Sequence, residues 1–318
     1  MKIGPIRIAR AATLAPMEEH TNHPFRCIAK RFGAALVVSE RIDAADVAAR
    51  DRRALRLLHT SSTEAPRAAQ LSGADPNVMA AAAEIVAGLG FDLVDLNFDC
   101  SIRRLAARGE GGVLLSDPPA IERIVAAVRK RVAIPVMLKI RSGPDAEHPT
   151  AVEVAKRAEG AGAAAVCVHG RSVAQGYVGE ADWSVIRAVK QAVGIPVLGS
   201  GSIRTAADAL ALLRDTGADA AAIARGCLGN PWIFQQTQSL LSSGPMSSAP
   251  SLHQRGRVLL ELVEGEFQLY GQPLALRRLP RTAGYFAHWL ANPAPFRESL
   301  RGLDSLAQFR RAVREYFG

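Results

Sequence analysis

A regular alternation of short apolar runs with longer amphipathic stretches constrains the fold of this chain more than any other feature. The runs recur at intervals of about 25 to 35 residues, which is typical of repeated βα units that build a parallel sheet. Eight of them occur in the 318 residues, at 12–16, 35–40, 66–71, 91–97, 134–140, 163–170, 195–201 and 220–226. Eight strands, each followed by a helix, predict an α/β fold of the (β/α)8 TIM-barrel type. A doubly wound open sheet is the alternative, but the chain has no GxGxxG turn to favour it.

The stretches between the runs carry recognisable helix signals. Residues 75–90 open on Asp75, have Pro76 at the first helical position and end in glycine. Residues 116–132 and 181–194 show a similar pattern of helix signals, and each of them is followed by a predicted strand that begins with Ile-Pro-Val. These signals strengthen the prediction of a repeated strand-helix unit.

The periodic pattern stops at residues 242–251, where small residues, Gly and Pro replace it. We therefore expect a barrel domain over residues 1–241, a linker over 242–251 and a second domain over 252–318. The second domain has the pattern of three or four helices rich in Leu, Phe and Arg. It carries ten Arg and no Lys against five Glu and one Asp. This basic excess favours an appended binding module over a purely structural cap.

The whole chain has a formal net charge of +9. Basic side chains that neutralise phosphates release counterions, so nucleic acid is the favoured partner, ahead of a membrane surface. A basic protein without an anionic partner is the alternative. The first residues lack the apolar region of a signal peptide, and no uncharged apolar run reaches the ~18 residues of a membrane span. We expect a cytoplasmic, monomeric protein that does not bind membranes.

The four cysteines lie far apart in the sequence and form no CxxC pair. Neither a zinc site nor a disulfide framework is therefore indicated, and we expect no metal. Cys167 lies inside an apolar run, which is typical of an inert buried thiol. Cys100 instead follows a predicted strand, in a loop that continues into Arg103 and Arg104. Because cationic neighbours lower the pKa of a thiol, we expect Cys100 to give or take a proton or to act as a nucleophile.

Chemistry in (β/α)8 enzymes takes place where the strands end, because the βα loops at that face converge on one ligand. The predicted strand ends are mostly polar, and comprise Met17, Glu40, Gln70, Asn97, Lys139, His169, Ser200 and Arg225. A single polar residue at a strand end is more often a loop hydrogen-bonder than a catalyst. A full ring of them favours a functional site.

Lys139 and His169 are the most informative of these residues. Lys139 lies within a parallel strand that is buried on both faces, where a charged side chain is costly unless it is paired or bound to a ligand. A bound anion or an electron-rich ring would compensate it. His169 precedes Gly170, which lets the backbone turn close to a ligand. A satisfied core histidine is the alternative for His169.

The segments after the seventh and eighth strands have the composition of a phosphate site. Many barrels bind phosphate at this place through backbone N–H groups and a short helix. Gly201 and Gly226 would allow a close approach of the ligand, and Arg225 offers a planar charged fork. The sequence therefore predicts a phosphorylated cofactor.

Several motifs along the barrel resemble those of one family. They are APM at 15–17, HPFR at 23–26, GAALVVSE at 33–40, AQLSGADP at 69–76, DLNFDC at 95–100, MLKIRSG at 137–143, VHGRSVAQGYVGEADW at 168–183 and ARGCLGNPWIF at 224–234. With these motifs the chain resembles the dihydrouridine synthases, flavin enzymes that reduce uridine in RNA. It is most similar to their bacterial B-type branch, and the resemblance spans nearly the whole chain.

The resemblance implies a barrel that binds FMN and a C-terminal helical domain that binds RNA. It places Pro16 and Met17 against the isoalloxazine ring, and Gln70 and Lys139 at the polar edge of that ring. Lys139 would also stabilise the negative charge that develops on the flavin upon reduction. The further contacts that it implies, to the ring edge and the phosphate, are His169, Ser200, Gly201, Arg225 and Gly226.

For the reaction, the resemblance implies NADPH as the reductant and a uridine of tRNA as the substrate. Asn97 would position the uracil. Cys100 would protonate C5 after hydride passes from the reduced flavin to C6, which is general acid catalysis by a positioned thiol. The basic residues that match RNA-contacting positions are Arg103, Arg104, Arg277 and Arg281. A solvated helix face is the alternative for the last two.

Three parts of the chain depart from the family pattern. Ser101 stands where the family usually has Pro, Ser200 and Ser202 stand where it has Asn and Asp, and Glu-Glu-His at 18–20 replaces small residues. Loss of the amide removes one hydrogen bond near the flavin, and carboxylates at the mouth would repel phosphate. Two further hypotheses therefore stay open. One is a divergent flavin-dependent paralogue that acts on another RNA, such as rRNA, or on a small unsaturated substrate; the other is an RNA-binding scaffold without catalysis.

Overall fold

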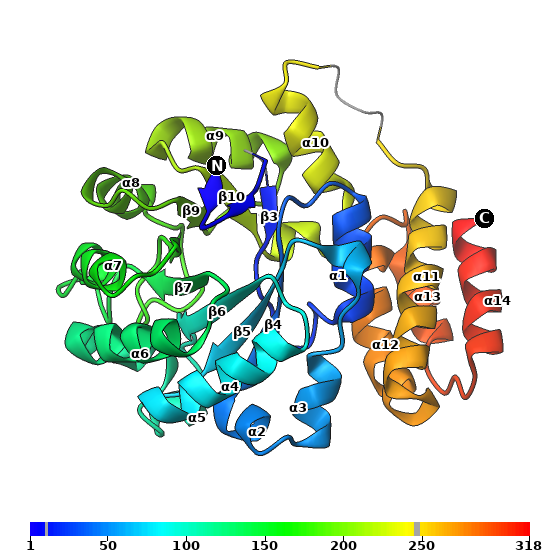
Figure 1. Ribbon diagram of the computed structural model, residues 1–318. Helices are drawn as coiled ribbons and strands as arrows, with labels where there is room; N and C mark the ends of the chain where they lie inside the picture. The colour runs from blue at the N-terminus through cyan, green and yellow to red at the C-terminus, as the bar shows by residue number, and fades with distance from the viewer. Residues whose placement is uncertain (10–11, 245–248) are drawn as a thin grey trace.

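Eight parallel strands form a closed barrel, which confirms the predicted TIM-barrel fold and excludes the open sheet (Figure 1). The computed structural model describes residues 1–9, 12–244 and 249–318. Around the ring the strand order is β10-β3-β4-β5-β6-β7-β8-β9. The strands are β3 (Ala12–Leu14), β4 (Val37–Asp43), β5 (Arg67–Ser72), β6 (Leu93–Phe98), β7 (Val136–Arg141), β8 (Ala165–His169), β9 (Val197–Ser200) and β10 (Ala220–Ile223). Each of them overlaps one of the eight predicted runs.

Helices connect the barrel strands, and most of them cover the outside of the barrel. They are α1 (His23–Arg31), α2 (Ala44–Ala48), α3 (Arg52–Leu57), α4 (Pro76–Gly88), α5 (Arg103–Ala106), α6 (Pro118–Arg131), α7 (Ala151–Gly160), α8 (Trp183–Ala192), α9 (Ala206–Thr216) and α10 (Trp232–Leu241), with 3-10 helices η1 (Ser62–Glu64), η2 (Gly111–Ser116) and η3 (Arg225–Cys227). The predicted start of α4 is confirmed, because the Asp75 carboxylate accepts the backbone N–H groups of Asn77 and Val78. None of the helices in the described part of the chain combines the length and apolarity that a membrane span requires.

A short antiparallel hairpin, which the sequence pattern did not predict, precedes the barrel. It consists of β1 (Lys2–Ile3) and β2 (Ile6–Arg7). Ile3 and Ile8 are buried in one cluster with side chains from the starts of the barrel strands, such as Leu93 and Leu198. The hairpin therefore plugs the amino-terminal end of the barrel. Cys167 lies in the same cluster and is buried, as predicted.

Four helices follow the barrel, in agreement with the predicted three or four. They are α11 (Leu252–Tyr270), α12 (Gln272–Ala287), α13 (Pro293–Ser299) and α14 (Leu306–Phe317). Figure 1 shows them packed together beside α1. The predicted linker starts directly after α10, but its residues 245–248 lie outside the described residues.

A buried carboxylate ties these C-terminal helices to the barrel. Glu266 on α11 accepts a hydrogen bond of 2.7 Å from Asn22 Nδ2, at the start of α1. It also accepts bonds from Arg278 Nε at 3.3 Å and from Thr282 Oγ1 at 3.0 Å, both on α12. Buried carboxylates are costly unless their oxygens are satisfied in this way, so the three partners fix α11 and α12 against α1.

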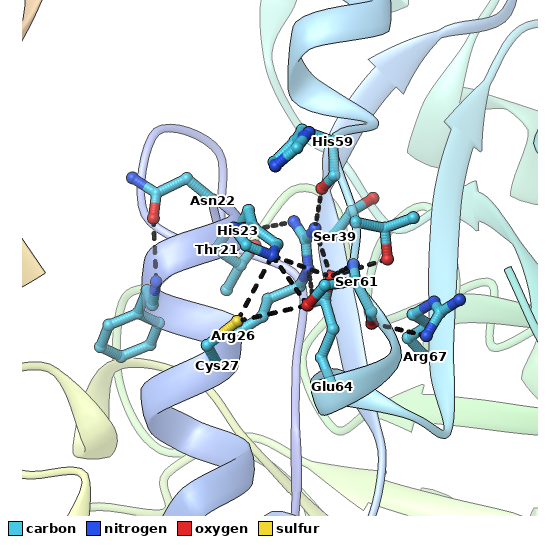
Figure 2. Close-up of polar contacts among 12 residues, drawn as sticks. Thr21, Asn22, His23, Arg26, Cys27, Ser39, His59, Ser61, Glu64 and Arg67 are labelled. Carbon is cyan, nitrogen blue, oxygen red and sulfur yellow. Dashed lines mark hydrogen bonds and ion pairs between the residues drawn. The ribbon is translucent and has the colours of Figure 1, made fainter. Parts of the chain in front are cut away.

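The HPFR motif at 23–26 has a structural role that its sequence did not reveal. Arg26 is fully buried, and its Nε lies 2.6 Å from Glu64 Oε2 (Figure 2). Its other nitrogens donate to the backbone carbonyls of Thr21 at 2.8 Å and His59 at 2.6 Å. A buried ion pair is stable only with such additional hydrogen bonds. The cluster anchors the loop between β3 and α1, which carries Met17.

Candidate active site

A cavity of about 1370 Å³ opens at the carboxyl ends of the barrel strands and extends to α11 and α12. It exceeds the range of about 300 to 1,000 Å³ typical of one drug-sized ligand, so it has room for more than one. The predicted site residues that line it are Pro16, Met17, Gln70, Asn97, Cys100, Lys139, His169, Ser200, Gly201, Arg225, Gly226 and Arg281. The predicted thiol and the predicted cofactor contacts therefore share one cavity.

The register of the barrel explains why these side chains converge. Asn97 pairs with Lys139 on the neighbouring strand, and Arg141 pairs with His169. His169 in turn pairs with Ser200. Because alternate side chains of a strand point to the same face, Lys139 and Arg141 lie on one side of β7. Residues far apart in the sequence are thus brought to one level of the barrel.

A chain of hydrogen bonds links the barrel interior to the Cys100 loop. Gln70 Nε2 donates to Asp95 Oδ2 at 2.8 Å, and Asn97 Nδ2 donates to Gln70 Oε1 at 2.9 Å. Asn97 Oδ1 then accepts the backbone N–H of Cys100 at 3.1 Å. Burial raises the pKa of Asp95 to about 7, although the bond from Gln70 and the charge of Lys139 oppose this. This series of hydrogen bonds sets the orientation of the Gln70 and Asn97 amides and, through them, the position of the Cys100 backbone.

Lys139 is paired with a protein carboxylate, which is one of the two ways, pairing or ligand binding, in which a buried lysine was expected to be compensated. Its Nζ lies 2.7 Å from Asp99 Oδ1, and Arg141 Nε lies 3.7 Å from the same oxygen. Burial alone would raise the pKa of Asp99, but Lys139 and Arg141 outweigh it and hold that pKa at about 2. Burial also disfavours the charged form of Lys139, yet Asp99 outweighs it and raises the Lys139 pKa. Lys139 is therefore a fixed cation in the cavity wall.

The expectation that nearby cations lower the pKa of Cys100 is wrong. Burial raises the pKa of its thiol, and Asp99 adds to the rise, while Arg41 opposes it. Arg103 and Arg104, the neighbours in sequence, are exposed on α5 and do not line the cavity. The thiol is thus protonated at neutral pH, a state that suits a proton donor better than a nucleophile.

His169 is buried and neutral. Burial is the main reason that its pKa is lowered to about 3, although Asp99 opposes the shift. Its Nδ1 lies 3.3 Å from the backbone nitrogen of Arg171 and accepts that N–H, which leaves the proton on Nε2. A Cβ added at Gly201 would lie 3.4 Å from Nε2. His169 therefore presents a hydrogen-bond donor beside the loop that follows β9.

The loops after β9 and β10 form a cradle of glycine backbone and guanidinium groups. Gly201 and Gly226 line the cavity, and glycine is needed at both because a Cβ would come within 2.7 Å of a neighbouring side chain at Gly201, whose φ is +108°, and within 2.6 Å of a neighbouring carbonyl at Gly226. Arg171 lines the cavity, and its buried Nη1 has no hydrogen-bond partner among the described residues. The Arg225 guanidinium lies 5.0 Å from the ring centre of Tyr177. This combination suits a phosphate group.

The residues that depart from the family pattern after Met17 connect the barrel mouth to neighbouring elements. Glu18 pairs with Arg41 at 3.1 Å, and Glu19 pairs with Arg281 on α12. His20 lies edge-on to an aromatic ring of α12, and burial lowers its pKa to about 4. Both carboxylates are therefore neutralised within the protein. The expectation that they repel phosphate does not take account of these partners.

The remaining predicted residues differ in their placement. Arg277 is exposed on α12 and, like Arg103 and Arg104, does not line the cavity. Ser202 Oγ accepts the backbone N–H of Ala181 and an N–H of Arg171, both at 3.0 Å, so its hydroxyl holds this loop. Within residues 1–9, 12–244 and 249–318, no three His, Cys, Asp or Glu side chains could hold a metal ion together.

Sequence reasoning missed several residues of the cavity wall. Asp99 and Arg171 line the cavity, and Arg141 contacts Asp99; all three lie inside motifs that drew attention for other residues. Arg141 carried a usable signal, because it lies two positions after Lys139 on a strand and so shares its face. Arg255 carried no such sequence signal, since it lies on α11, far along the chain from the strand ends.

Comparisons with known proteins give a consistent result. The family model described as Dihydrouridine synthase (Dus) matches residues 13–316. The tRNA-dihydrouridine synthase B of Pseudomonas aeruginosa is 36% identical over 319 residues, covering 100% of this chain and 96% of that protein. A protein of Rickettsia conorii called Probable tRNA-dihydrouridine synthase is 34% identical over 318 residues, covering 100% of this chain and 96% of its own length.

Solved structures with a similar fold are more distant in sequence. Histamine dehydrogenase from Rhizobium sp. 4-9 has a TM-score of 0.59 at 14% identity, over 83% of this chain and 50% of that one. Morphinone reductase has a TM-score of 0.53 at 13% identity, over 79% of this chain and 90% of that one. At these identities the likeness shows the barrel fold alone. The family match over nearly all residues and the full-length identities above 30% show that the chain belongs to the dihydrouridine synthase family.

Proposed function

We propose that this chain reduces the C5–C6 double bond of uridine to dihydrouridine in tRNA, with bound FMN as its cofactor and NADPH as its reductant. The observation that carries the proposal is that the protonated thiol of Cys100 and the fixed cation Lys139 line one cavity. Membership of the family supports the choice of substrate. A tRNA substrate implies a cytoplasmic enzyme, and we expect it to act as a monomer without a membrane or a metal.

The residues of the cavity fit a flavin mononucleotide. The unpartnered Nη1 of Arg171 and the glycine cradle suit its phosphate, and Lys139 with the second amide hydrogen of Gln70 suits the polar edge of its ring. Pro16 and Met17 supply an apolar wall. The further cofactor contacts in the proposal are His169, Ser200, Gly201, Arg225 and Gly226. When bound, the flavin supplies the hydride.

Asn97 and Cys100 act on the uracil in this proposal. Asn97 uses its oxygen and one amide hydrogen within the protein, which leaves a second N–H for a carbonyl of the base. Cys100 donates its proton to C5, so that a hydride at C6 and a proton at C5 saturate the double bond. The thiolate is then reprotonated from water. Because its pKa is raised, the Cys100 thiol stays protonated at neutral pH and can act as the general acid.

The RNA contacts in the proposal are arginines around the cavity mouth. Arg103 and Arg104 on α5 and Arg277 on α12 are exposed and available to phosphates. Arg281 lines the cavity but is held by Glu19. Phosphate contacts of this kind position a nucleic acid without reading its sequence.

The proposed function predicts a yellow protein whose gene is needed for dihydrouridine. The purified chain should show a flavin band in the visible blue, and should form dihydrouridine in unmodified tRNA when NADPH is supplied. Mass-spectrometric mapping of tRNA and rRNA, with and without the gene, should locate the modified uridine. A chain without that band that cannot be reconstituted with FMN contradicts the proposal. Unchanged dihydrouridine in the deletion strain contradicts it as well, and favours the divergent paralogue.

The ion pair between Glu19 and Arg281 yields a further prediction. Glu19→Gln should tighten tRNA binding about 3-fold and should steepen the dependence of affinity on salt by about one ion, because Arg281 is freed to neutralise a phosphate. Both side chains are half exposed, so the free energy of unfolding should change by less than about 1 kcal/mol. Binding titrations at several salt concentrations check this. Glu264→Gln, which frees Arg310 on another face, is the control, and equal effects of the two variants contradict the prediction.

A further inference from the structure

One arm of the cavity, on the side of residues 252–318, contains a buried arginine for which the described residues supply no counter-ion. Arg255 on α11 is only 4% exposed and lines the cavity. Its guanidinium lies between two indoles, 5.3 Å from the ring centre of Trp232 and 3.6 Å from that of Trp289. Within the described residues it forms no ion pair, and burial alone lowers its pKa to about 10. The residues outside the description, 10–11 and 245–248, carry no carboxylate.

Burying an unpaired guanidinium costs desolvation free energy, so the groups around Arg255 indicate which ligand it binds. Arg255 Nη1 donates to the carbonyl of Gly229 at 3.3 Å, the one hydrogen bond that it makes among the described residues. A guanidinium has five N–H donors, so most of its capacity is unused. The two indole faces offset part of the desolvation through cation–π interaction. The unused donors belong to a side chain of the cavity wall, where an anion would complete their hydrogen bonds.

Aromatic and basic side chains from residues 252–318 line the same cavity as this arginine. The Trp289 indole is held in place because its Nε1 donates to Gly229 O at 3.0 Å, yet 40% of the residue is exposed. Tyr285 is 36% exposed. Arg297 on α13 lines the cavity and forms no ion pair within the described part of the chain. The arm therefore offers positive charge next to fixed, exposed rings.

We propose that this arm, formed by Arg255, Trp289, Tyr285 and Arg297, binds the nucleotide that neighbours the target uridine in the RNA strand. Arg255 and Arg297 contact its phosphate, and its base stacks on the exposed part of Trp289. The proposal rests on the proposed function and names a subsite for the same substrate. Proteins bind single strands through this pairing of a basic groove with stacking rings. A uridine that enters a cavity must leave its stack, which also frees the adjacent base.

The position of the arm favours RNA over the nicotinamide dinucleotide, the other ligand here that combines phosphate with a base. Every member of the arm lies in residues 252–318, the segment that carries ten Arg and no Lys. The volume of about 1370 Å³ also leaves space beyond a flavin for a strand that enters from this side.

Arg255→Met is the direct test, because methionine keeps an unbranched side chain between the two indoles but removes the charge. Binding of an unmodified tRNA transcript and of a short single-stranded oligouridylate is measured at several salt concentrations. We expect the affinity for both to fall about 3- to 10-fold and the salt slope to fall by about one. Arg255→Lys should keep the slope. Trp289→Phe should weaken oligouridylate binding about 5-fold without changing the slope.

Arg257→Met is the matched control, because Arg257 is exposed on α11 and does not line the cavity. It should leave the affinity for oligouridylate unchanged. Thermal unfolding of each variant shows whether it is folded; if Arg255→Met is not, Arg255→Lys and Trp289→Phe carry the test. Unchanged RNA affinity and slope in folded Arg255→Met overturns the proposal, and so does unchanged oligouridylate affinity in folded Trp289→Phe or a raised KM for NADPH with unchanged RNA binding. A wild-type protein that neither binds RNA nor forms dihydrouridine instead refutes the proposed function.

Discussion

Replacement of Cys100 by alanine is expected to lower dihydrouridine formation by about 10²- to 10⁴-fold, the range that general acid catalysis supplies. The thiol lies in the cavity wall, its backbone is held by Asn97, and its raised pKa keeps the proton in place. Reduction of the bound flavin by NADPH needs no proton from this thiol and should keep its rate. Stopped-flow absorbance of the flavin measures that half-reaction, and mass spectrometry of the tRNA measures the other.

Cys27→Ala is the control, because Cys27 is another half-buried free thiol but lies on α1, outside the cavity. It should retain both rates. The pH dependence adds a second check: product formation in the wild type should fall as the pH rises through the raised pKa of Cys100, above the ordinary value of 9.0. If Cys100→Ala forms product at the wild-type rate, the proton comes from another group.

Lys139→Met is expected to lower the free energy of unfolding by about 3 kcal/mol and to abolish stable flavin binding. The loss of stability follows because removal of one member of a buried ion pair leaves the other charge uncompensated. Asp99 would retain only Arg141, at 3.7 Å. Urea unfolding at neutral pH measures the first effect, and the ratio of flavin to protein after purification measures the second.

The double variant Lys139→Met with Asp99→Asn separates these two effects. It removes both charges, so most of the stability should return, whereas flavin binding should not. The pH dependence has a defined sign: because the Asp99 pKa of about 2 lies below its ordinary value of 3.8, the pair contributes fully above about pH 4, and its contribution is lost as the pH falls through 2. Normal stability and flavin content in Lys139→Met would show that the cation is dispensable.

The barrel could be predicted from the sequence because each of its eight strands is a short apolar run, and recognisable helix starts follow several of these runs. Both signals are local, as the helix start at Asp75 and Pro76 shows. The hairpin of β1 and β2 was missed because two-residue strands are too short to show a periodicity. Its burial depends on Ile3 and Ile8 meeting the barrel interior, which is a tertiary event.

The candidate site was predictable where topology alone brings residues together. Asn97, Lys139 and His169 converge because parallel strands end at one face. Charge partners were not predictable. Arg103 and Arg104 follow Cys100 in sequence but face solvent, whereas Asp99, just after β6, contacts Lys139 on the neighbouring strand β7.

That Arg255 has no counter-ion among the described residues could not be predicted from the sequence either. Its surroundings depend on the indoles of Trp232, at the start of α10, and Trp289, in the turn after α12, both lying against one guanidinium, and no spacing in the chain encodes that arrangement. Charge pairing between strand ends and stacking of an arginine on two indoles are decided by packing, which a linear pattern does not contain.

The pairing of β10 with β3 has a consequence for biosynthesis. The last strand of the ring hydrogen-bonds to the first, at Ala12–Leu14, so the cylinder cannot close until Ala220–Ile223 has been translated. The nascent chain carries an open sheet edge throughout that interval, and such an edge invites pairing with other chains. Contacts such as Asn22 with Glu266 form later still. A chain released from a ribosome that stalls before β10 is complete would therefore keep an open sheet edge, would need a chaperone, and would lack a complete ligand cavity.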